Sequence, residues 1–372
     1  MSWKDSCQLC SKNTEKVIVT RDTSKDRIFP LQGSFTIPNN KKKFIKFVST
    51  ARGWGGCARS ITTIMKMLLK NGHKVEFIPF KNVVASREFQ ECIKNELSGL
   101  IVTTNYETVK EKCDIFFMYA DDYVWEFKTP EVSSVFSEIN ADKKIMMLNY
   151  RRGPVGQVEW TKGWDKYMFL NSGQEKELLK LLPNAKTKVL PPCTELDEFV
   201  RINPTFDDSV INVVRHSSQG DTKFSKDFQK EVDSILNCRP DVKMAFMPPP
   251  TFISISDRVV KIPKTPNPSE VAQFLGTGNL FVYSLPNGYM DMGPRTILEA
   301  MAVGLPIIAD NWGGAVDRVT PECGWLCDTK EQMVEIIKNV TVQELRKKGQ
   351  AAKQRAILEF IPLRWLKEIL EC

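Results

Sequence analysis

The segment "NLFVYSLPNGYMDMGPRTILEAMAVGLPIIADNWGGAVD", residues 279–317, alternates apolar runs with glycine and proline. The run "NLFVYS" predicts a strand, and Pro294 suits the first turn of a helix, where its missing N–H is not needed. Gly304 and Pro306 end that helix, because glycine favours the position after a helix and proline cannot continue it. The run "IIAD" predicts the next strand. The segment is therefore a strand–loop–helix–strand unit, with loop 285–293 at the carboxyl end of a strand.

The same alternation continues along the chain in two series. One begins with the strand pattern "KFIKFVST", followed by the glycine loop "ARGWGGCARS" and a helix, and the other begins with "VINVVRHSS". Two successive βα series predict an α/β protein with two doubly wound, Rossmann-like domains that face a cleft. We expect an N-terminal extension at 1–42, an N-terminal domain at 43–199, a linker at 200–208, a C-terminal domain at 209–345, and helices at 346–372 that pack back on the N-terminal domain.

The composition is that of a globular protein, because 42% of the 372 residues are hydrophobic and 26% are charged. No apolar run approaches the roughly 18–20 residues that span a bilayer, and the N-terminus lacks the apolar core of a signal peptide. We therefore expect a cytoplasmic protein without a transmembrane segment. The ten cysteines are expected to be reduced thiols. Cys7 and Cys10 have the spacing of half a zinc site, but the second half is missing nearby.

Positive charge is concentrated near the N-terminus. The chain has a formal net charge of +7, and residues 1–50 hold ten Lys or Arg and four Asp or Glu, which gives +6 for that segment. A basic segment suits a polyanion, such as nucleic acid, or an anionic membrane surface. A solvated lead-in would have the same composition, so charge alone leaves both interpretations open.

The quoted segment also combines groups that suit a ligand with phosphates and hydroxyls. The helix that begins near Pro294 offers free N–H groups and a positive dipole end to an anion such as a diphosphate. Glu299, just over a turn later, can accept hydrogen bonds from two neighbouring hydroxyls, as a ribose presents, and Asp291 in the loop can reach a second polyol. The structural alternative is a capping acid followed by an ordinary helix. The combination favours a nucleotide-sugar, with further candidate donor-binding residues at Gly293, Arg295 and Thr296.

Asp291-x7-Glu299, followed by "AMAVGLPIIADNWGGAVD", resembles the E-x7-E region of retaining GT-B glycosyltransferases, in particular the large family four. The resemblance covers most of residues 44–345. It implies a GT-B fold and transfer of a sugar from a nucleotide-sugar, a UDP-sugar in our expectation, with retention of configuration and without a metal ion or other cofactor. Asp291 stands where the family usually has Glu, and "DMGP" replaces the common "EGFG", so the identity of the sugar stays open.

Two further motifs match this resemblance. In the family's similar motif an Arg and a Lys clamp the donor diphosphate, and Arg215 and Lys223 have the corresponding spacing, with His216 beside the phosphates. Preorganised cations there would stabilise the charge that develops on the leaving diphosphate. The loop "ARGWGGCARS" lets backbone N–H groups of Gly55 and Gly56 approach a phosphate or sugar, although a tight turn between strand and helix would also need these glycines.

The acceptor side has weaker candidates. Many relatives carry a histidine after the strand that corresponds to "IFFMYA", and here Asp121 and Asp122 occupy that place, so we include both with Arg215, Lys223 and Asp291 as candidate catalytic residues. A second pair after another strand gives the acceptor-side candidates Arg151 and Arg152. Each of these charges could instead lie in a solvated loop.

Three functions remain open from the sequence. The segment "ARGWGGCARS…LLKNGHKV" also resembles the matching segment of phage DNA α-glucosyltransferases. Together with the basic first fifty residues, this resemblance favours transfer to a hydroxymethylated base of double-stranded DNA. The first alternative is a bacterial envelope enzyme with a lipid-linked or saccharide acceptor. The second is a non-catalytic protein that only binds a nucleotide-sugar. The sequence does not predict an oligomeric state.

Overall fold

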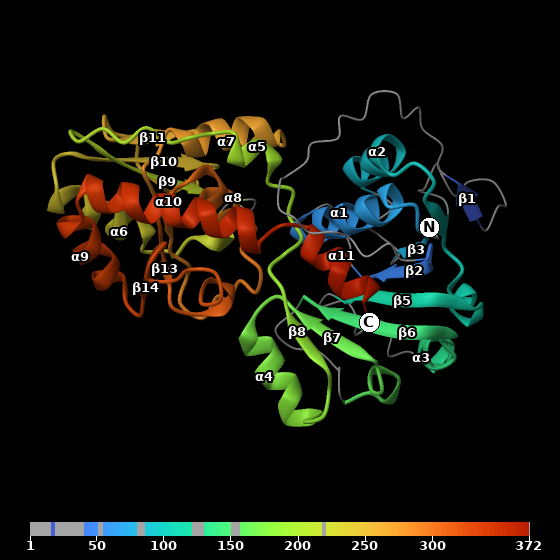
Figure 1. Cartoon of the computed structure of the whole chain (residues 1–372). Helices are drawn as coiled ribbons and strands as arrows, with labels where there is room; N and C mark the ends of the chain where they lie inside the picture. The colour runs from blue at the N-terminus through green and yellow to red at the C-terminus, as the bar shows by residue number, and fades with distance from the viewer. Residues whose placement is uncertain are drawn as a thin grey trace. The chain divides into compact units, whose positions relative to one another are not determined.

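The computed structural model describes residues 16–18, 41–50, 55–79, 86–120, 130–149, 157–217 and 221–371. The chain divides into two compact units (Figure 1). The first unit comprises Met1–Cys193 together with Pro362–Cys372, and the second comprises Thr194–Ile361. Each unit is built on one sheet of parallel strands, which confirms the predicted α/β class with two Rossmann-like sheets.

The sheet of the first unit has the order β1-β4-β3-β2-β5-β6-β7-β8, and only the edge strand β1 is antiparallel to its neighbour. Its central strands are nearly continuous apolar runs, such as "CDIFFMYA", because helices cover both faces of a parallel sheet. Strand order reverses between β2 and β5. The strands are β1 (Lys16–Ile18), β2 (Phe44–Ser49), β3 (Lys74–Pro79), β4 (Ile101–Thr103), β5 (Cys113–Ala120), β6 (Ala141–Leu148), β7 (Lys166–Phe169) and β8 (Thr187–Val189).

Helices cover both faces of this sheet (Figure 1). On one face α2 packs through Phe89, whose ring lies 5.7 Å from that of Phe77 on β3. On the other face, Phe136 of α3 packs edge-on against Phe116 of β5. The helices are α1 (Gly56–Lys70), α2 (Arg87–Glu96), α3 (Pro130–Ser137), α4 (Ser172–Leu181) and α11 (Leu363–Leu370), with the 3₁₀ turns η3 (Tyr106–Lys110) and η5 (Glu159–Thr161).

The sheet of the second unit is entirely parallel, with the order β11-β10-β9-β12-β13-β14. Counted along the chain this is 3-2-1-4-5-6, the order of a doubly wound dinucleotide-binding sheet, and it reverses between β9 and β12. Ligands of such sheets bind at the carboxyl ends of the strands next to this reversal. The strands are β9 (Ile211–His216), β10 (Val242–Met247), β11 (Val259–Lys261), β12 (Leu280–Tyr283), β13 (Ile307–Asp310) and β14 (Gly324–Cys327).

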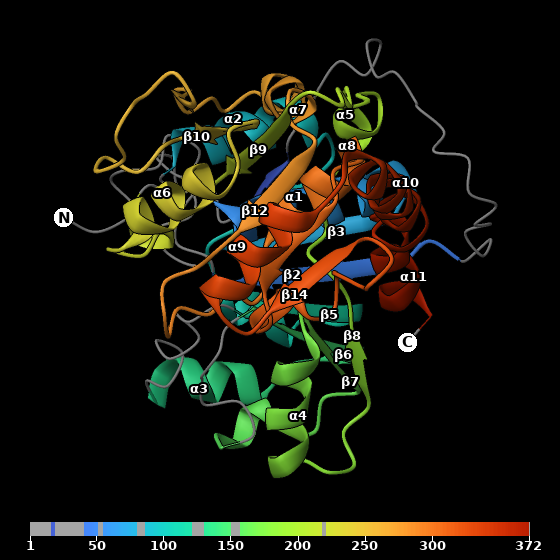
Figure 2. The ribbon, with the colours of Figure 1, turned by 90° about the vertical axis from the view of Figure 1, so that its left-hand side faces the viewer.

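Figure 2 shows α6 and α9 on one side of these strands and α8 and α10 on the other. The α6–α9 side buries one apolar cluster, and the opposite side buries a second cluster that includes every apolar residue of α8. The helices are α5 (Asp197–Val200), α6 (Phe228–Cys238), α7 (Pro268–Gly276), α8 (Arg295–Val303), α9 (Lys330–Asn339) and α10 (Val342–Glu359), with the 3₁₀ turns η6 (Asp221–Lys223) and η7 (Gly313–Ala315).

The units differ from the expected boundaries in three places. β1 lies within the expected extension 1–42 and pairs with β4. The second unit begins at Thr194, so α5 belongs to it rather than to the domain expected at 43–199. Of the helices expected to return to the N-terminal domain, only α11 does so, because α10 packs on α8 in the second unit.

The packing of α10 explains its place. Gly304 ends α8 with a left-handed φ of 106°, as predicted, and Gly349 of α10 lies against it so closely that a Cβ at Gly349 would overlap the carbonyl oxygen of Gly304. This approach requires a residue without a side chain at position 349, whereas Gly304 is required by its left-handed φ, since a Cβ there would lie no closer than 3.5 Å to any neighbour. α11 instead joins the first unit through Trp365, which is buried and donates to the carbonyl oxygen of Pro191 at 2.9 Å.

The described residues test in part the expectations of reduced cysteines and of a chain without a transmembrane segment. The cysteines at positions 57, 92, 113, 193, 238, 323 and 327 are free thiols, whereas Cys7 and Cys10 lie outside the described residues. Across the described ranges, no helix combines the length and apolar character that crossing a bilayer requires.

Candidate functional site

The candidate site lies at the carboxyl ends of β9 and β12, where the strand order reverses. Successive residues of a strand point to opposite faces of the sheet. Ile211 and Val213 face the α6–α9 side, and Arg215 follows them, packing on aromatic rings of that side. His216 therefore points to the α8 side, where its Nδ1 lies 3.4 Å from Oε2 of Glu299. The two neighbours on β9 thus serve different faces of the site.

Arg215 is buried, with 1% of its surface exposed. Its guanidinium carbon lies 3.9 Å from the centre of the Phe224 ring, and its Nη2 donates to the carbonyl oxygen of Lys223 at 2.5 Å. Burial lowers the pKa of Arg215 to about 10, so it stays protonated at neutral pH. Its Nε and Nη1 have no hydrogen-bond partner among the described residues. A buried cation with donors left over is costly unless an anion reaches it.

Lys223, Tyr283 and Asp291 meet at one carboxylate oxygen. Oδ2 of Asp291 accepts from Nζ of Lys223 at 2.5 Å and from the hydroxyl of Tyr283 at 2.6 Å. Oδ1 accepts from the backbone N–H of Gly293 at 3.1 Å. Burial raises the pKa of Asp291, but the attraction of Lys223 and these hydrogen bonds outweigh burial, so the pKa is lowered overall. Asp291 is therefore an ionised carboxylate with a partner on each oxygen.

α8 places Glu299 next to the same strands. The helix begins at Arg295, so Pro294 is the residue before the helix and not, as predicted, in its first turn. No side chain of the described residues caps this end. Glu299 and Thr296 are both buried, at 4% and 7% exposure, and the hydroxyl of Thr296 has no hydrogen-bond partner in the part of the chain that the structure describes. Polar groups buried on one turn of a helix are typical of a ligand site.

The glycine pair of the quoted segment lies beneath the loop that carries Asp291. The backbone N–H of Gly314 donates to the carbonyl oxygen of Asp291 at 2.9 Å. A Cβ at Gly314 would lie 2.8 Å from Cδ of Pro294 and would overlap the carbonyl oxygen of Met292. The pair is therefore required for the close approach of η7 to loop 285–293.

Arg318 fills the space behind this pair. It is 1% exposed and its Nη1 donates to the carbonyl oxygen of Gly314. Burial lowers its pKa to about 10, against the attraction of Asp291 and Asp317. Sequence reasoning missed Arg318, although an arginine four residues after a glycine pair was a visible signal. It also missed Tyr283, because a tyrosine at the end of an apolar strand is typical of a core residue.

A second set of charged groups fixes the beginning of the loop. Oδ2 of Asp310 accepts from the backbone N–H of Leu285 at 2.6 Å, while Oδ1 of Asp310 pairs with Nζ of Lys330 at 2.6 Å. Lys330 also donates to the carbonyl oxygen of Leu285 at 3.0 Å. Both backbone groups of Leu285 are thus held, which anchors the loop to β13 and α9. Burial raises the pKa of Asp310.

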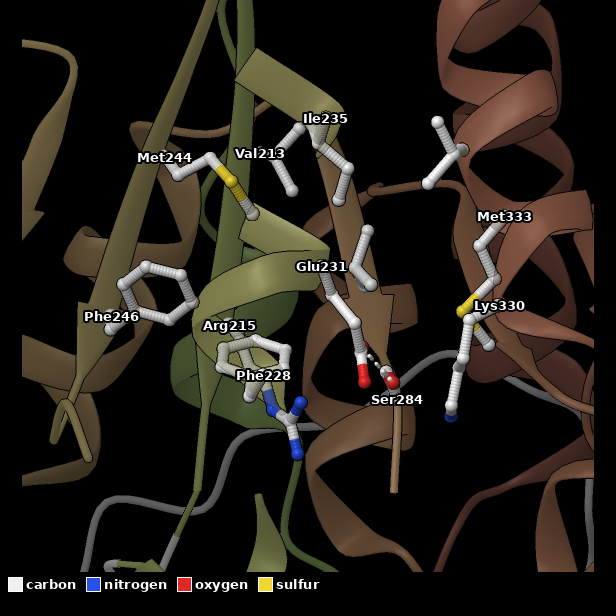
Figure 3. A pocket seen from close by; sticks show the side chains of 12 residues that line it. Val213, Arg215, Phe228, Glu231, Ile235, Met244, Phe246, Ser284, Lys330 and Met333 are labelled. Atoms are coloured by element: carbon white, nitrogen blue, oxygen red, sulfur yellow. Dashed lines mark hydrogen bonds between the residues drawn. The ribbon is translucent and has the colours of Figure 1, made fainter. Parts of the chain in front are cut away.

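Arg215 lines a pocket on the α6–α9 side (Figure 3). Figure 3 shows Glu231 bonded to Ser284, with Arg215 beneath Phe228 and Lys330 across from Glu231. The remaining lining is apolar: Val213, Ile235, Met244, Phe246, Val282, Met333 and Val334. Asp291 and Glu299 do not line it, so among the candidate donor residues of the second unit the pocket includes only Arg215.

The structure thus brings together Arg215, Lys223 and Asp291, and separately His216 and Glu299, at the end of one sheet. Gly55 and Gly56 lie in the first unit, where Gly55 precedes α1 with an extended φ of −163°. They follow β2, next to the strand reversal of that sheet. The predicted residues Asp121, Asp122, Arg151 and Arg152 lie outside the described residues.

Comparison with known proteins gives a family match within the second unit. Residues 253–357 match the model of the family "Glycosyl transferases group 1". Over 152 residues the chain is 28% identical to the alpha-1,3/1,6-mannosyltransferase alg-2 of Neurospora crassa. That match covers 38% of this chain and spans only 28% of the relative's length.

Solved structures match over most of the chain. HepE of Anabaena, solved with UDP, has a TM-score of 0.68 at 15% identity, over 88% of this chain and 98% of that one. Another structure of HepE holds UDP-glucose. The lipopolysaccharide outer core galactosyltransferase WaaB has a TM-score of 0.63 at 13% identity, over 88% and 99%. At these identities the likeness establishes the fold. The chain therefore has the GT-B fold, and its residues 253–357 are similar to the group 1 glycosyltransferase family.

Proposed function

We propose that this protein transfers a sugar from a nucleotide-sugar to a saccharide or lipid-linked saccharide, with retention of configuration. The observation that carries the proposal is the cluster of Lys223, Asp291 and the α8 end at the strand reversal of the second unit. Asp291 and α8 lie within the segment that matches the group 1 family, and Lys223 precedes this segment in the sequence. HepE, which shares the fold, binds UDP and UDP-glucose.

The proposed roles follow from chemistry and burial. Lys223, Arg215 and the N–H groups at the start of α8 hold the diphosphate, because a cation and a helix end both favour negative charge. Glu299 accepts hydrogen bonds from the ribose hydroxyls, and Nδ1 of His216 lies 3.4 Å from its Oε2. Asp291 accepts from a hydroxyl of the sugar. Gly293, Arg295 and Thr296 complete the donor side.

In the proposed reaction, the bond between the anomeric carbon and the diphosphate oxygen breaks as the acceptor oxygen bonds to the same face of that carbon. The proton of the acceptor hydroxyl passes to the leaving diphosphate. Lys223, Arg215 and the helix end stabilise the charge on the leaving group without a metal ion. No residue of the chain is required as a nucleophile in this scheme.

The test is a transfer assay that separates donor from acceptor. Purified protein is offered UDP-glucose, UDP-galactose, UDP-N-acetylglucosamine and GDP-mannose, each with a lipopolysaccharide-core oligosaccharide, a lipid-linked saccharide or no acceptor. Released nucleotide and product mass are measured, and NMR of the product gives the anomeric configuration. Glycosylated saccharide with the donor's configuration supports the proposal. If the protein neither transfers nor hydrolyses any of the donors, the proposal is contradicted. Inversion of configuration would contradict the proposed stereochemistry.

DNA is the second candidate acceptor, supported by the +6 charge of residues 1–50. The same assay therefore includes duplex DNA with 5-hydroxymethylcytosine, and unmodified duplex as its control. An adduct on the modified base alone would replace the saccharide proposal. Removal of residues 1–40 then weakens DNA binding and flattens its salt dependence, because each lost phosphate contact lowers the slope by about one. An unchanged slope would separate the basic segment from DNA binding.

A further inference from the structure

Tyr283 is a buried tyrosine among charged groups. It ends β12, is 1% exposed, and stacks its ring on that of Phe281 at 6.3 Å. Its hydroxyl donates to Oδ2 of Asp291 at 2.6 Å and accepts from Nζ of Lys223 at 3.3 Å. The guanidinium carbon of Arg215 lies 5.7 Å from the ring centre. One phenol therefore contacts both members of an ion pair and lies beside a third charged group.

The pairing of Lys223 with Asp291 poses a problem for donor binding. Lys223 and Asp291 are 12% and 13% exposed, and they are paired with each other. A diphosphate that takes the ammonium of Lys223 removes a partner from Asp291, and a buried carboxylate that loses its partners is strongly destabilised. The Tyr283 hydroxyl and the Gly293 N–H do not depend on Lys223, so they can continue to hold Asp291.

We propose that Tyr283 is a positioning residue of the donor site, whose hydroxyl keeps Asp291 in place while Lys223 turns from Asp291 to the donor diphosphate. This inference rests on the proposed function. Burial, and then the charge of Asp291, raise the pKa of Tyr283 well above its ordinary value, so the phenol stays protonated and remains a donor. The charge of Arg318 also attracts Asp291.

The test is Tyr283→Phe, which keeps the ring and removes only the hydroxyl. Loss of a hydrogen bond to a charged group predicts a fall of roughly 10- to 100-fold in kcat/KM for the panel donor that gives most product. The Kd for UDP, measured by titration calorimetry, is expected to rise, which means weaker binding. Tyr167→Phe is the matched control, because Tyr167 is also buried and donates to the carbonyl oxygen of Thr161 at 2.8 Å, but in the first unit. It lowers thermal stability without changing the Kd for UDP.

A double-mutant cycle tests whether Tyr283 acts through Asp291. In the Asp291→Asn background, the same Tyr283→Phe change is expected to alter kcat/KM by less than about threefold. An equal fall in both backgrounds, or an unchanged kcat/KM and Kd in Tyr283→Phe, overturns the positioning role and leaves the proposed function standing. A wild-type protein that neither binds UDP nor turns over any donor overturns both.

Discussion

Gly313→Ala is the sharpest test of how the glycine pair shapes the site. Gly313 has a left-handed φ of 60°, and a Cβ there would lie 2.6 Å from the carbonyl oxygen of Asp291 and 3.2 Å from Cγ of Met290. An ordinary contact begins at 3.4 Å, so the backbone of Asp291 has to retreat by a little under 1 Å. The substitution therefore disturbs a proposed catalytic residue without touching its side chain.

The expected magnitude has two parts. An alanine in the left-handed conformation costs about 1–2 kcal/mol, and relieving the overlap costs about 1–3 kcal/mol more. For a unit of this size the sum lowers Tm by roughly 5–15 °C. A displacement near 1 Å at the reacting centre lowers kcat/KM by about 100-fold.

Gly288→Ala is the matched control, because Gly288 lies in loop 285–293, the loop of Asp291, with a φ of 77° and no atom within 4 Å of the added methyl. It carries the backbone strain without the overlap, so we expect a loss of about 1–2 kcal/mol and kcat/KM within about threefold of wild type. Thermal unfolding and donor turnover are measured on both variants. If the two variants lose equal stability and activity, the contact between Gly313 and Asp291 has no effect and the reasoning is wrong.

Three other predictions follow from the same contacts. Glu299→Gln should lower kcat/KM for the donor by about 10- to 100-fold with little change in Tm, since the amide keeps the volume but loses the charged acceptor; unchanged turnover would refute the ribose assignment. Because the pKa of Asp291 is lowered in the folded state, its ionised carboxylate stabilises the fold at pH values above the ordinary pKa of 3.8, and this contribution is lost as the pH falls through the folded pKa. In an acid titration, Asp291→Asn should therefore lose less stability than wild type over that pH range. Trp365→Ala should destabilise the first unit by about 3–5 kcal/mol, whereas Leu358→Ala, at a residue 56% exposed, should stay near wild type in urea denaturation.

The periodic parts of the fold were predictable from sequence because each depends on local chemistry. The strand of "CDIFFMYA", the helix after the first glycine loop and the end of α8 at Gly304 all lie where residue pattern and turn chemistry require them. The division between α10 and α11 was not predictable in this way. Both are amphipathic helices, and which sheet each one covers depends on a distant partner, such as Gly304 for Gly349. From sequence alone, a glycine inside a helix indicates only a lower helix stability, and its packing role is visible only when the partner is known.

The candidate site shows the same limit. Arg215, Lys223, Asp291 and Glu299 carry a spacing that points to donor chemistry, and that part was visible. Their partners were not visible, because the tyrosine whose hydroxyl donates to Asp291 belongs to an apolar strand typical of a protein core. Loop 285–293 is also held at its start by Lys330, which lies far along the chain.

These partners bear on which ligand the site prefers. Lys223 is paired with Asp291 inside the protein, and Nδ1 of His216 lies 3.4 Å from Oε2 of Glu299 without a hydrogen bond between these two atoms. A ligand with only anionic oxygens can compete for Lys223 but offers neither carboxylate a hydrogen-bond donor. A nucleotide-sugar brings phosphates for the cations and hydroxyls for the carboxylates at once, so it replaces the contact between Lys223 and Asp291 and also offers Glu299 hydrogen-bond donors. On this reasoning inorganic diphosphate should bind far more weakly than a complete nucleotide-sugar, and the difference should shrink when Asp291 and Glu299 are both made amides.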